Sequence, residues 1–520
     1  MRSRFQHFLT LRPTPGTMFR IAVDIVAIWL STLFGWLLVA GHGISALFED
    51  VATPTLLLIV LWSLVAVVTY AGAGLYARPY SHLLSMKLRR IVTINLVLFS
   101  IAIYRALDAP QQTATELQQI FAAFASATLL HCLSRLAAAV LRFERAPEAA
   151  KSSSVGENEE NKVLVIGGAG YIGSALVEKL LGQGLQVSVL DAMHYGDETL
   201  ARVIQHPNLT LIRDDFRHIE VLTRAMNGIG SVIHLGGLVG DPACAVEAEL
   251  TIDVNVTATK LVSEIAKACG VRRFIFASSC SVYGACDEIV DEVSRLNPQS
   301  LYARTKVASE IVLGALNSPQ FAVTCLRFAT IYGLSGRVRF DLVVNLFCAK
   351  AVRDRIISVF GADQWRPFVH VDDVATAVMM TLRAPVALVA GEAFNVGCNA
   401  QNFTLGDVAE LVNRQVPDAR IAVDDTFVDR RNYRVCFDKI RVVLGFEPAW
   451  TLERGIAQVV TRVRSNEVGH YTLPAYSNVL YLKERGTQAF ANFKITGWET
   501  ELMNVDRIAT GKMIDRPAAA

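Results

Sequence analysis

Three residues in the second half of this 520-residue chain have the side chains and the spacing to move a proton to or from a substrate hydroxyl. Tyr302 and Lys306 would share one face of a helix, because residues i and i+4 are neighbours on a helical surface. A lysine ammonium there lowers the pKa of the phenol and so favours a tyrosine that acts as a base. Ser279, in the run Ser-Ser-Cys-Ser-Val-Tyr-Gly at residues 278–284, has a hydroxyl that can orient the same oxygen.

The elements that must bring these groups together are predicted from runs of β-branched and aromatic residues. One such run, residues 273–277, stands immediately before the serine motif and predicts a strand. Similar runs predict strands at residues 162–166, 186–190, 209–212, 231–235 and 322–326. Helical stretches separate them, and this alternation indicates an α/β fold with a doubly wound parallel sheet.

A glycine-rich segment joins the first predicted strand to a helical stretch at residues 174–181. Its glycines, Gly167, Gly170 and Gly173, have a spacing that lets the backbone approach a pyrophosphate at a helix N-terminus. Asp191 follows about 20 residues later, where a carboxylate binds the ribose hydroxyls and repels a 2′-phosphate. Asp191 as a simple helix cap is the alternative. The strand–loop–helix context favours a Rossmann-type sheet that binds NAD rather than NADP.

The composition separates a second region from this one. Apolar residues make up 52% of the chain, charged residues make up 19%, and the mean hydropathy of +0.35 is high for a globular protein. The excess lies before residue 145, in apolar segments at residues 21–40, 54–75, 91–107 and 117–141. A helix crosses a bilayer with about 20 apolar residues, so residues 1–145 are predicted to be an α-helical membrane domain with about four spans. A signal peptide is the alternative for the first segment, and a re-entrant segment is the alternative for the third.

Loop charges predict the orientation of these spans. Basic residues precede the first span, occupy the middle loop at residues 78–90 and follow the fourth span at Arg142 and Arg145. The positive-inside rule then places the N-terminus, the middle loop and everything after Arg145 in the cytoplasm. The expected location is therefore the inner (cytoplasmic) membrane, with a polar linker at residues 146–161 leading to a cytoplasmic catalytic domain.

Ionisable residues also stand within the apolar segments. Asp24, His131 and Arg135 mark either a transport path or a lipid headgroup site, or they pair and snorkel near helix ends.

Charge and cysteine usage exclude other classes of protein. The net charge of +2 argues against a nucleic-acid binder. The nine cysteines are scattered without a Cys-x-x-Cys pair, which argues against a disulfide framework or a zinc site, so no metal is expected.

The motifs of residues 162–465 resemble the NAD-dependent nucleotide-sugar epimerase/dehydratase family of the extended short-chain dehydrogenase/reductase superfamily. The resemblance rests on the glycine loop, the serine motif and Tyr-x-x-x-Lys, together with Val-Ile-His-Leu-Gly-Gly at 232–237 and Arg-Pro-Phe-Val-His-Val-Asp-Asp at 366–373. It implies a smaller C-terminal substrate-binding subdomain, mainly residues 330–465, followed by an extension at 466–520.

The resemblance also implies roles for individual residues. It assigns catalysis to Ser279, Tyr302 and Lys306. It assigns cofactor contacts to Gly167, Gly170, Tyr171, Ile172, Gly173, Asp191, Asp215, Phe216, Leu235, Asn255, Ser278, Tyr302, Lys306 and Phe328. It assigns substrate contacts to Ser279, Thr330, Arg366 and Arg431, with the two arginines on a nucleotide diphosphate.

Two positions beside Ser279 bear on the type of reaction. Members that remove a C5 proton and the C6 hydroxyl commonly carry an Asp-Glu pair where this chain has Cys280 and Ser281. A 4-epimerase needs no such pair, so an epimerase that oxidises sugar C4 and reduces it on the other face is expected. A 4,6-dehydratase, a decarboxylase, a ketoreductase or a non-catalytic NAD-binding membrane regulator are the alternatives.

The whole arrangement resembles the membrane-bound nucleotide-sugar enzymes of bacterial polysaccharide and glycan synthesis. Leu75 and Tyr76 begin a segment similar to their Leu-Tyr-x-x-x-x-Tyr element, although the second tyrosine here comes one residue early. An additional nucleotide-binding domain common in those enzymes has only a linker in its place. The partners implied are a nucleotide sugar or a lipid-linked sugar, membrane lipids and a second copy in a homodimer.

Overall fold

The computed structural model of the chain describes residues 21–31, 63, 65–70, 91–100, 121–133, 161–424 and 432–485. The chain divides into two compact units, Met1–Ser153 and Ser154–Ala520. Each unit is described by itself below.

A seven-stranded sheet forms the centre of the second unit, in the order β11-β7-β5-β4-β1-β2-β3, and every neighbouring pair is parallel. The strands are β1 (Lys162–Ile166), β2 (Gln186–Asp191), β3 (Leu209–Arg213), β4 (Ser231–His234), β5 (Arg273–Ser279), β7 (Ala322–Phe328) and β11 (Glu392–Val396). Their apolar side chains are buried between helices on both faces, which is why they appear in the sequence as continuous apolar runs.

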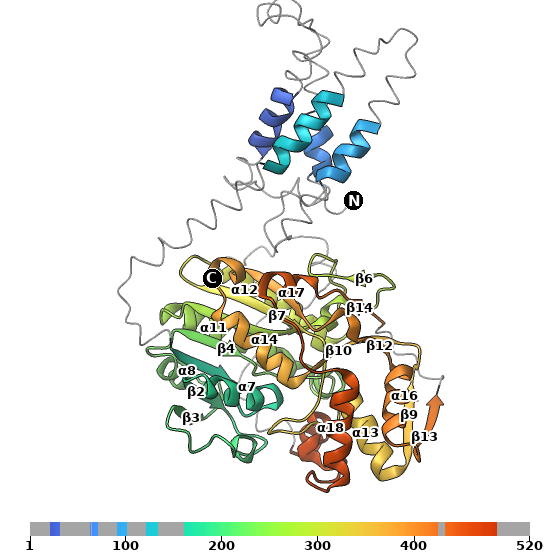
Figure 1. Ribbon diagram of the computed structural model, residues 1–520. Helices are drawn as coiled ribbons and strands as arrows, with labels where there is room; N and C mark the ends of the chain where they lie inside the picture. The colour runs from blue at the N-terminus through green and yellow to red at the C-terminus, as the bar shows by residue number, and fades with distance from the viewer. Residues whose placement is uncertain are drawn as a thin grey trace, which may run out of the picture. The chain divides into compact units, whose positions relative to one another are not determined.

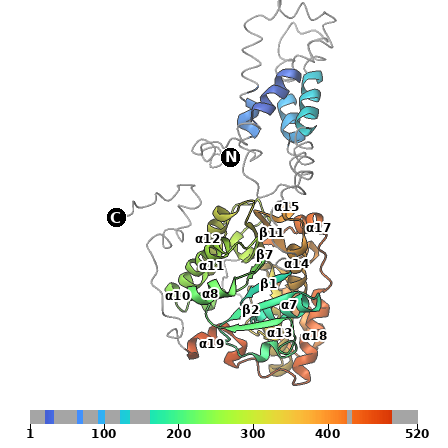
Figure 2. The same ribbon diagram turned by 90° about the vertical axis from the view of Figure 1, so that its left-hand side faces the viewer.

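Two layers of helices cover this sheet (Figures 1 and 2). Helices α7 (Tyr171–Gly182) and α14 (Val371–Arg383) pack into one apolar core. Helices α8 (Ile219–Ala225), α11 (Ala258–Ala268) and α12 (Leu301–Leu316) pack into the core on the other face. The predicted Rossmann-type doubly wound sheet is therefore confirmed.

A smaller lobe with its own apolar core follows the sheet in the sequence. It is built from β8 (Thr330–Tyr332), α13 (Val343–Asp354), β9 (Ile356–Phe360), β10 (Trp365–His370), β12 (Asn402–Thr404), α16 (Leu405–Gln415), β13 (Arg420–Asp424) and α18 (Leu452–Arg464). Shorter elements are β6 (Ile289–Val290), α9 (Asp241–Cys244), α10 (Ala248–Ile252), α15 (Val386–Val389), β14 (Arg434–Val435), α17 (Asp438–Leu444) and α19 (Asn478–Arg485).

The described residues of the first unit are helical and fall within the four predicted apolar segments. Among them, no helix combines the length and the apolar character that crossing a membrane requires. The rest of these segments lies outside the described residues.

Polar side chains are buried where these helices meet. The Tyr70 hydroxyl donates to the Asn95 side-chain oxygen at 2.7 Å and lies 2.9 Å from Nδ1 of His131. His131 in turn approaches Asp24, with 3.2 Å from its Nε2 to the Asp24 carbonyl oxygen. All four side chains are at least nine-tenths buried, whereas Leu96, on the same helix as Asn95, is 58% exposed.

Candidate active site

The glycine-rich loop leaves the end of β1 and becomes the N-terminus of α7, with Gly170 as the N-cap residue. Gly167 has a φ of +79°, and a Cβ atom there would lie 2.7 Å from the Gly236 backbone nitrogen. A Cβ atom on Gly173 would collide with the carbonyl oxygen of Gly167. Both positions therefore require glycine, and the loop leaves the first backbone N–H groups of α7 to face an anion.

Asp191 ends β2 directly beside this loop. Its carboxylate accepts hydrogen bonds from the backbone N–H groups of Ala169 (2.9 Å) and Met193 (2.8 Å). Burial raises the pKa of Asp191, and these two hydrogen bonds oppose the rise. The predicted ribose carboxylate thus also fixes the glycine-rich loop.

Other predicted cofactor residues surround the same edge of the sheet. Asp215 accepts three hydrogen bonds from the Arg217 guanidinium. Phe216 lies against Gly236 in the loop after β4, and Leu235 is the residue that follows this strand. The Asn255 side-chain oxygen accepts a hydrogen bond from the Leu238 backbone N–H at 2.8 Å, and the Asn255 side-chain nitrogen donates to the Leu238 carbonyl oxygen at 2.9 Å. Asn255 therefore holds the loop after β4 in place.

The proposed catalytic residues meet between β5 and α12. Ser279 is the last residue of β5 and pairs in register with Phe328 at the end of β7. Helix α12 begins after Ser300, whose hydroxyl caps the N–H of Ala303 and donates to Asp241 at 2.5 Å. This cap fixes the first turn of α12, which carries Tyr302.

Tyr302 and Lys306 share one face of α12, as the sequence predicts. The Lys306 ammonium lies 5.7 Å from the centroid of the Tyr302 ring and donates to the Ala277 carbonyl oxygen at 2.8 Å. Because the lysine is 4% exposed, burial lowers its pKa to about 8.

Burial is the largest influence on the pKa of the Tyr302 phenol. Burial raises the pKa of Tyr302 above its ordinary value, and Cys244 and Asp241 raise it further. A hydrogen bond with Ser279 and the positive charge of Arg339 lower it. The groups that favour the phenolate most are thus Ser279 and Arg339, since the Lys306 ammonium is directed at the Ala277 carbonyl oxygen.

Ser278 and Cys280, on either side of Ser279, are directed into the protein. The Ser278 hydroxyl donates to Glu310 at 2.6 Å, and Glu310 is ion-paired with Arg327. The Cys280 thiol donates to the Arg327 carbonyl oxygen at 3.2 Å, and burial raises its pKa well above the ordinary value. Cys280 therefore stays a neutral thiol.

The predicted substrate residues lie on adjacent strands of the smaller lobe. Thr330 begins β8 and pairs with Phe368 on β10, the strand that also carries Arg366. Arg366 is 6% exposed, and its guanidinium carbon lies 5.6 Å from the Tyr433 ring centroid. Arg431 lies outside the described residues.

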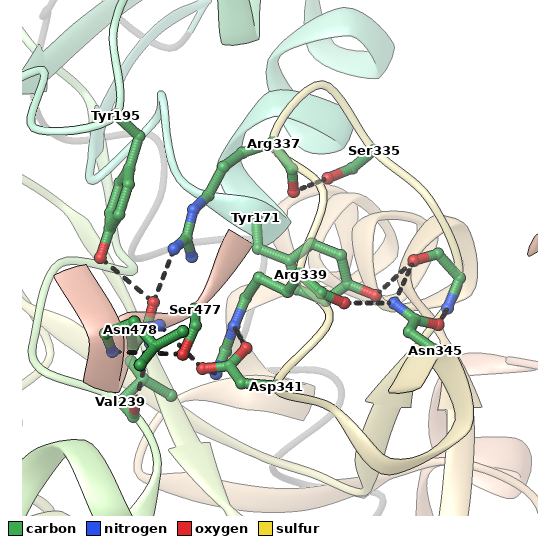
Figure 3. Close-up of polar contacts among 12 residues, drawn as sticks. Tyr171, Tyr195, Val239, Ser335, Arg337, Arg339, Asp341, Asn345, Ser477 and Asn478 are labelled. Atoms are coloured by element: carbon green, nitrogen blue, oxygen red, sulfur yellow. Dashed lines mark hydrogen bonds and ion pairs between the residues drawn. The ribbon is translucent and has the colours of Figure 1, made fainter. Parts of the chain in front are cut away.

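Three residues that the sequence motifs do not include complete the neighbourhood, namely Arg337, Arg339 and Asn478 (Figure 3). Arg337 and Arg339 stand in the loop after β8, and Asn478 begins α19 in the C-terminal extension. The Nε atom of Arg339 lies 2.9 Å from the Asp341 carboxylate, and its guanidinium carbon lies 6.0 Å from the centroid of the Tyr171 ring. No motif predicts them, since their position depends on how a loop and the extension fold back onto the sheet.

The geometry fits a dinucleotide. The glycine loop has no room for a side chain at Gly167 or Gly173, the N-terminus of α7 offers backbone N–H groups, and Asp191 stands at the end of the neighbouring strand. The Nε–H of Arg337, buried in the loop after β8, has no hydrogen-bond partner within the described part of the chain. These residues would hold the pyrophosphate and a ribose of NAD.

Comparisons with known proteins agree with a site for NAD. Residues 163–397 match the family described as "NAD dependent epimerase/dehydratase family". The UDP-glucose 4-epimerase of Bacillus subtilis is 30% identical over 343 residues, which cover 59% of this chain and 98% of that protein. UDP-glucuronic acid decarboxylase 1 of Arabidopsis thaliana is 29% identical, over 58% of this chain and 70% of that protein.

A solved structure gives the same picture. MoeE5 in complex with UDP-glucuronic acid and NAD is 28% identical, with a TM-score of 0.52 over 59% of this chain and 99% of that chain. The site described above and the extent of the match to the Bacillus enzyme lead to one conclusion. The chain belongs to the NAD dependent epimerase/dehydratase family, and NAD is its cofactor.

Proposed function

We propose that this protein is a membrane-anchored nucleotide-sugar 4-epimerase. One observation carries the choice of epimerase over the other reactions of the family: the two positions after Ser279 hold a buried neutral thiol and a hydroxyl. Neither group removes a proton from carbon or protonates a departing hydroxyl at neutral pH.

The chain's own residues supply binding, orientation and proton transfer. Tyr302 takes the proton from the sugar 4-hydroxyl and returns it, while the Ser279 hydroxyl orients the same oxygen. Arg339 favours the phenolate during this transfer. NAD held by the glycine loop and Asp191 would supply the hydride chemistry at sugar C4, both the oxidation and the reduction on the other face, and its positive charge would also favour the phenolate. The residues of this chain then need only let the oxidised sugar rotate, so that its other face is presented to the cofactor.

The two carboxylates that act on Cys280, Glu292 and Glu310, do not supply the missing acid–base pair. Glu310 is bound to Ser278 and Arg327, and Glu292 accepts a hydrogen bond from the Asn395 backbone at 2.8 Å. Both side chains belong to buried networks. A dehydratase or a decarboxylase remains the alternative because similar proteins include both kinds of enzyme.

The diphosphate of the nucleotide is assigned to Arg366 and Arg431. Next to Arg366, the Trp365 N–H donates to the Asn432 side chain at 2.9 Å. Arg431 itself lies outside the described residues. Arginine is assigned to the diphosphate because a guanidinium group binds phosphate oxygens in a bidentate manner.

The reaction is tested by identifying products with NMR. The full-length protein would be incubated with NAD and a panel of nucleotide sugars, including UDP-glucose and UDP-glucuronic acid. The proposal predicts a C4 epimer with C6 unchanged. A 4-keto-6-deoxy sugar or a pentose would instead assign the chain to the dehydratases or the decarboxylases.

The distribution of polar and apolar side chains in the first unit supports the proposed membrane anchor. Its described helices bury Asp24, Tyr70, Asn95 and His131 and leave large apolar side chains exposed, which is the reverse of a helix bundle in water. Bundles in lipid have this pattern, because polar groups must find partners inside. We expect the inner membrane, with the catalytic unit in the cytoplasm, and extraction with alkaline carbonate should leave the protein in the membrane pellet.

Anchoring would place the active site where lipid-linked sugars are assembled, as in polysaccharide or glycan synthesis. Nucleotide sugars and polyprenyl-diphosphate sugars both carry a diphosphate, so Arg366 does not distinguish them. Assays of the full-length protein in detergent with each substrate would do so. We expect turnover of the free nucleotide sugar; turnover of the lipid-linked sugar alone would contradict this.

A further inference from the structure

The C-terminal extension crosses the edge of the sheet where NAD binds, and it does so through Asn478, the first residue of α19. The relatives described above match only 58–59% of this chain while being covered over 70–99% of their own lengths. The family match itself ends at residue 397. The extension lies beyond the residues that match the family, so we infer its role from its own contacts in this chain.

Asn478 ties three loops together, and it is 8% exposed. Its side-chain oxygen accepts from the Tyr195 hydroxyl at 3.1 Å and from Arg337 Nη2 at 2.7 Å. Its side-chain nitrogen donates to the Val239 carbonyl oxygen at 2.8 Å, and its backbone N–H donates to Asp341 at 2.9 Å. These partners belong to the loops that follow β2, β4 and β8 (Figure 3).

Helix α19 is also anchored by apolar contacts. Leu482 is 4% exposed and packs in one cluster with Ala243 and Leu250 of α9 and α10, beside Phe216 and Leu238. The Tyr481 ring lies 4.7 Å from the Tyr195 ring. Because two of the three tied loops follow strands β2 and β4, the extension spans the crevice at the carboxyl ends of the sheet strands, where dinucleotides bind.

Arg337 is the group that this arrangement positions. Its guanidinium lies 3.5 Å from the centroid of the Tyr195 ring and is held by Asn478, while its backbone N–H contacts the Ser174 hydroxyl in the first turn of α7. Arg337 is 6% exposed, and none of the residues that the structure describes accepts a hydrogen bond from its Nε–H. Leaving a buried donor without a partner destabilises a protein, so this N–H indicates that a ligand atom binds here.

Two observations indicate that this ligand atom is anionic. Burial lowers the pKa of Arg337 to about 10, which leaves the side chain charged at neutral pH, and the Asp191 carboxylate is among the groups that keep it charged. Arg339 pairs with Asp341 through two hydrogen bonds, whereas Arg337 has no carboxylate bound to it among the described residues. Its unused charge stands beside the helix N-terminus that binds a pyrophosphate.

We propose that residues 474–485 form a clasp over the NAD crevice, and that the clasp residue Asn478 holds Arg337 so that its Nε–H binds the cofactor's pyrophosphate. The clasp keeps NAD bound between catalytic cycles, as an enzyme that reuses the same cofactor in each turnover requires. The inference rests on NAD as the cofactor and not on the epimerase reaction.

The test measures binding of the cofactor by the full-length protein, without any turnover. NADH fluorescence would give the affinity, and a chase with excess NAD would give the dissociation rate. Asn478→Ala should speed NADH dissociation about tenfold, because it frees the Arg337 guanidinium and unties the loops. Glu484→Gln, an exposed change on the same helix, is the matched control and should leave the rate unchanged.

The direct contact is tested with Arg337→Gln. It should weaken NADH and ADP-ribose about tenfold to a hundredfold but leave the affinity for adenosine, which has no phosphate, unchanged. Arg441→Gln, at an exposed arginine of α17, is the control. Equal weakening of adenosine would make Arg337 a purely structural residue, and an unchanged dissociation rate in Asn478→Ala would remove the clasp. Either result would overturn the proposal whether or not the protein proves to be an epimerase.

Discussion

The two units of this protein bury opposite kinds of side chain. In the catalytic unit, apolar strands fill the interior, and the buried charges are paired, as Arg327 is with Glu310. In the first unit, Asp24 and His131 meet inside while Leu96 and Phe121 are 58% and 61% exposed. The catalytic unit hides its apolar surface from water. The opposite pattern in the first unit is the one that the proposed membrane anchor requires, since a helix bundle in lipid exposes apolar side chains.

Removing one tyrosine hydroxyl from each unit should give the largest difference in turnover between the two units. Tyr302→Phe removes the proposed base and should lower turnover by a factor of about 10²–10⁴. Tyr70→Phe removes a hydroxyl that bonds Asn95 and His131, and it should leave turnover within a few-fold of the original.

The measurement is the initial rate of both full-length variants, with NADH binding as the control for folding. Loss of cofactor binding in Tyr302→Phe would assign Tyr302 a structural role. Loss of turnover in Tyr70→Phe would mean that the chemistry is not confined to the catalytic unit.

Introducing a charged side chain on the exposed surface of each unit tests whether that surface faces lipid or water. Leu96→Asp in the first unit and Ile219→Asp on α8 alter side chains with nearly equal exposure, 58% and 56%. In lipid, the first should cost about 2.5–3.5 kcal/mol of insertion free energy. The second, in water, should stay within about 0.5 kcal/mol of the original stability.

The fraction of each variant recovered in the membrane reports the outcome. Equal tolerance of both charges would contradict a lipid-facing first unit.

A smaller effect is expected at the cofactor's ribose. Asp191→Ala removes a carboxylate that can accept hydrogen bonds from the ribose hydroxyls, so NADH should bind about ten to a hundred times more weakly. NADPH should lose much less, because its 2′-phosphate meets repulsion from Asp191 in the original protein. Titration of both cofactors by fluorescence gives the ratio, and an equal loss for both would remove Asp191 from the ribose site.

The smallest effect concerns pH. Burial raises the pKa of Tyr302, and the Arg339 charge lowers it, so Arg339→Gln should raise the phenol pKa. A base acts in its deprotonated form, so the rising limb of the pH–rate profile should move to higher pH in this variant. A limb that stays in place would show that Arg339 does not act on the base.

The fold was largely predictable because parallel strands buried on both faces are visible as apolar runs. Each predicted strand of the sheet begins at the observed residue. The ends differ more: β5 and β7 continue to Ser279 and Phe328, since these residues pair with each other across the sheet. Local sequence patterns do not show such pairing, which depends on the neighbouring strand.

The site was predictable where chemistry and spacing lie within one element. Tyr302 and Lys306 share a helix face, and Asp191 stands beside the glycine loop. The contacts of Lys306 with Ala277 and of Ser278 with Glu310 were not predictable, because both follow from how α12 packs on β5. Arg337 and Asn478 escaped prediction for the same reason, since a loop and the extension meet only in the folded chain.

We propose that the catalytic unit epimerises sugar C4 without removing the C5 proton. Turnover of a nucleotide sugar by the full-length protein in D₂O, followed by NMR of the product, tests this proposal. We expect a C4 epimer with no deuterium at C4 or C5, because the hydride returns to C4 and the C5 proton never leaves. Deuterium at C5, together with loss of the C6 hydroxyl or of the carboxylate, would contradict it.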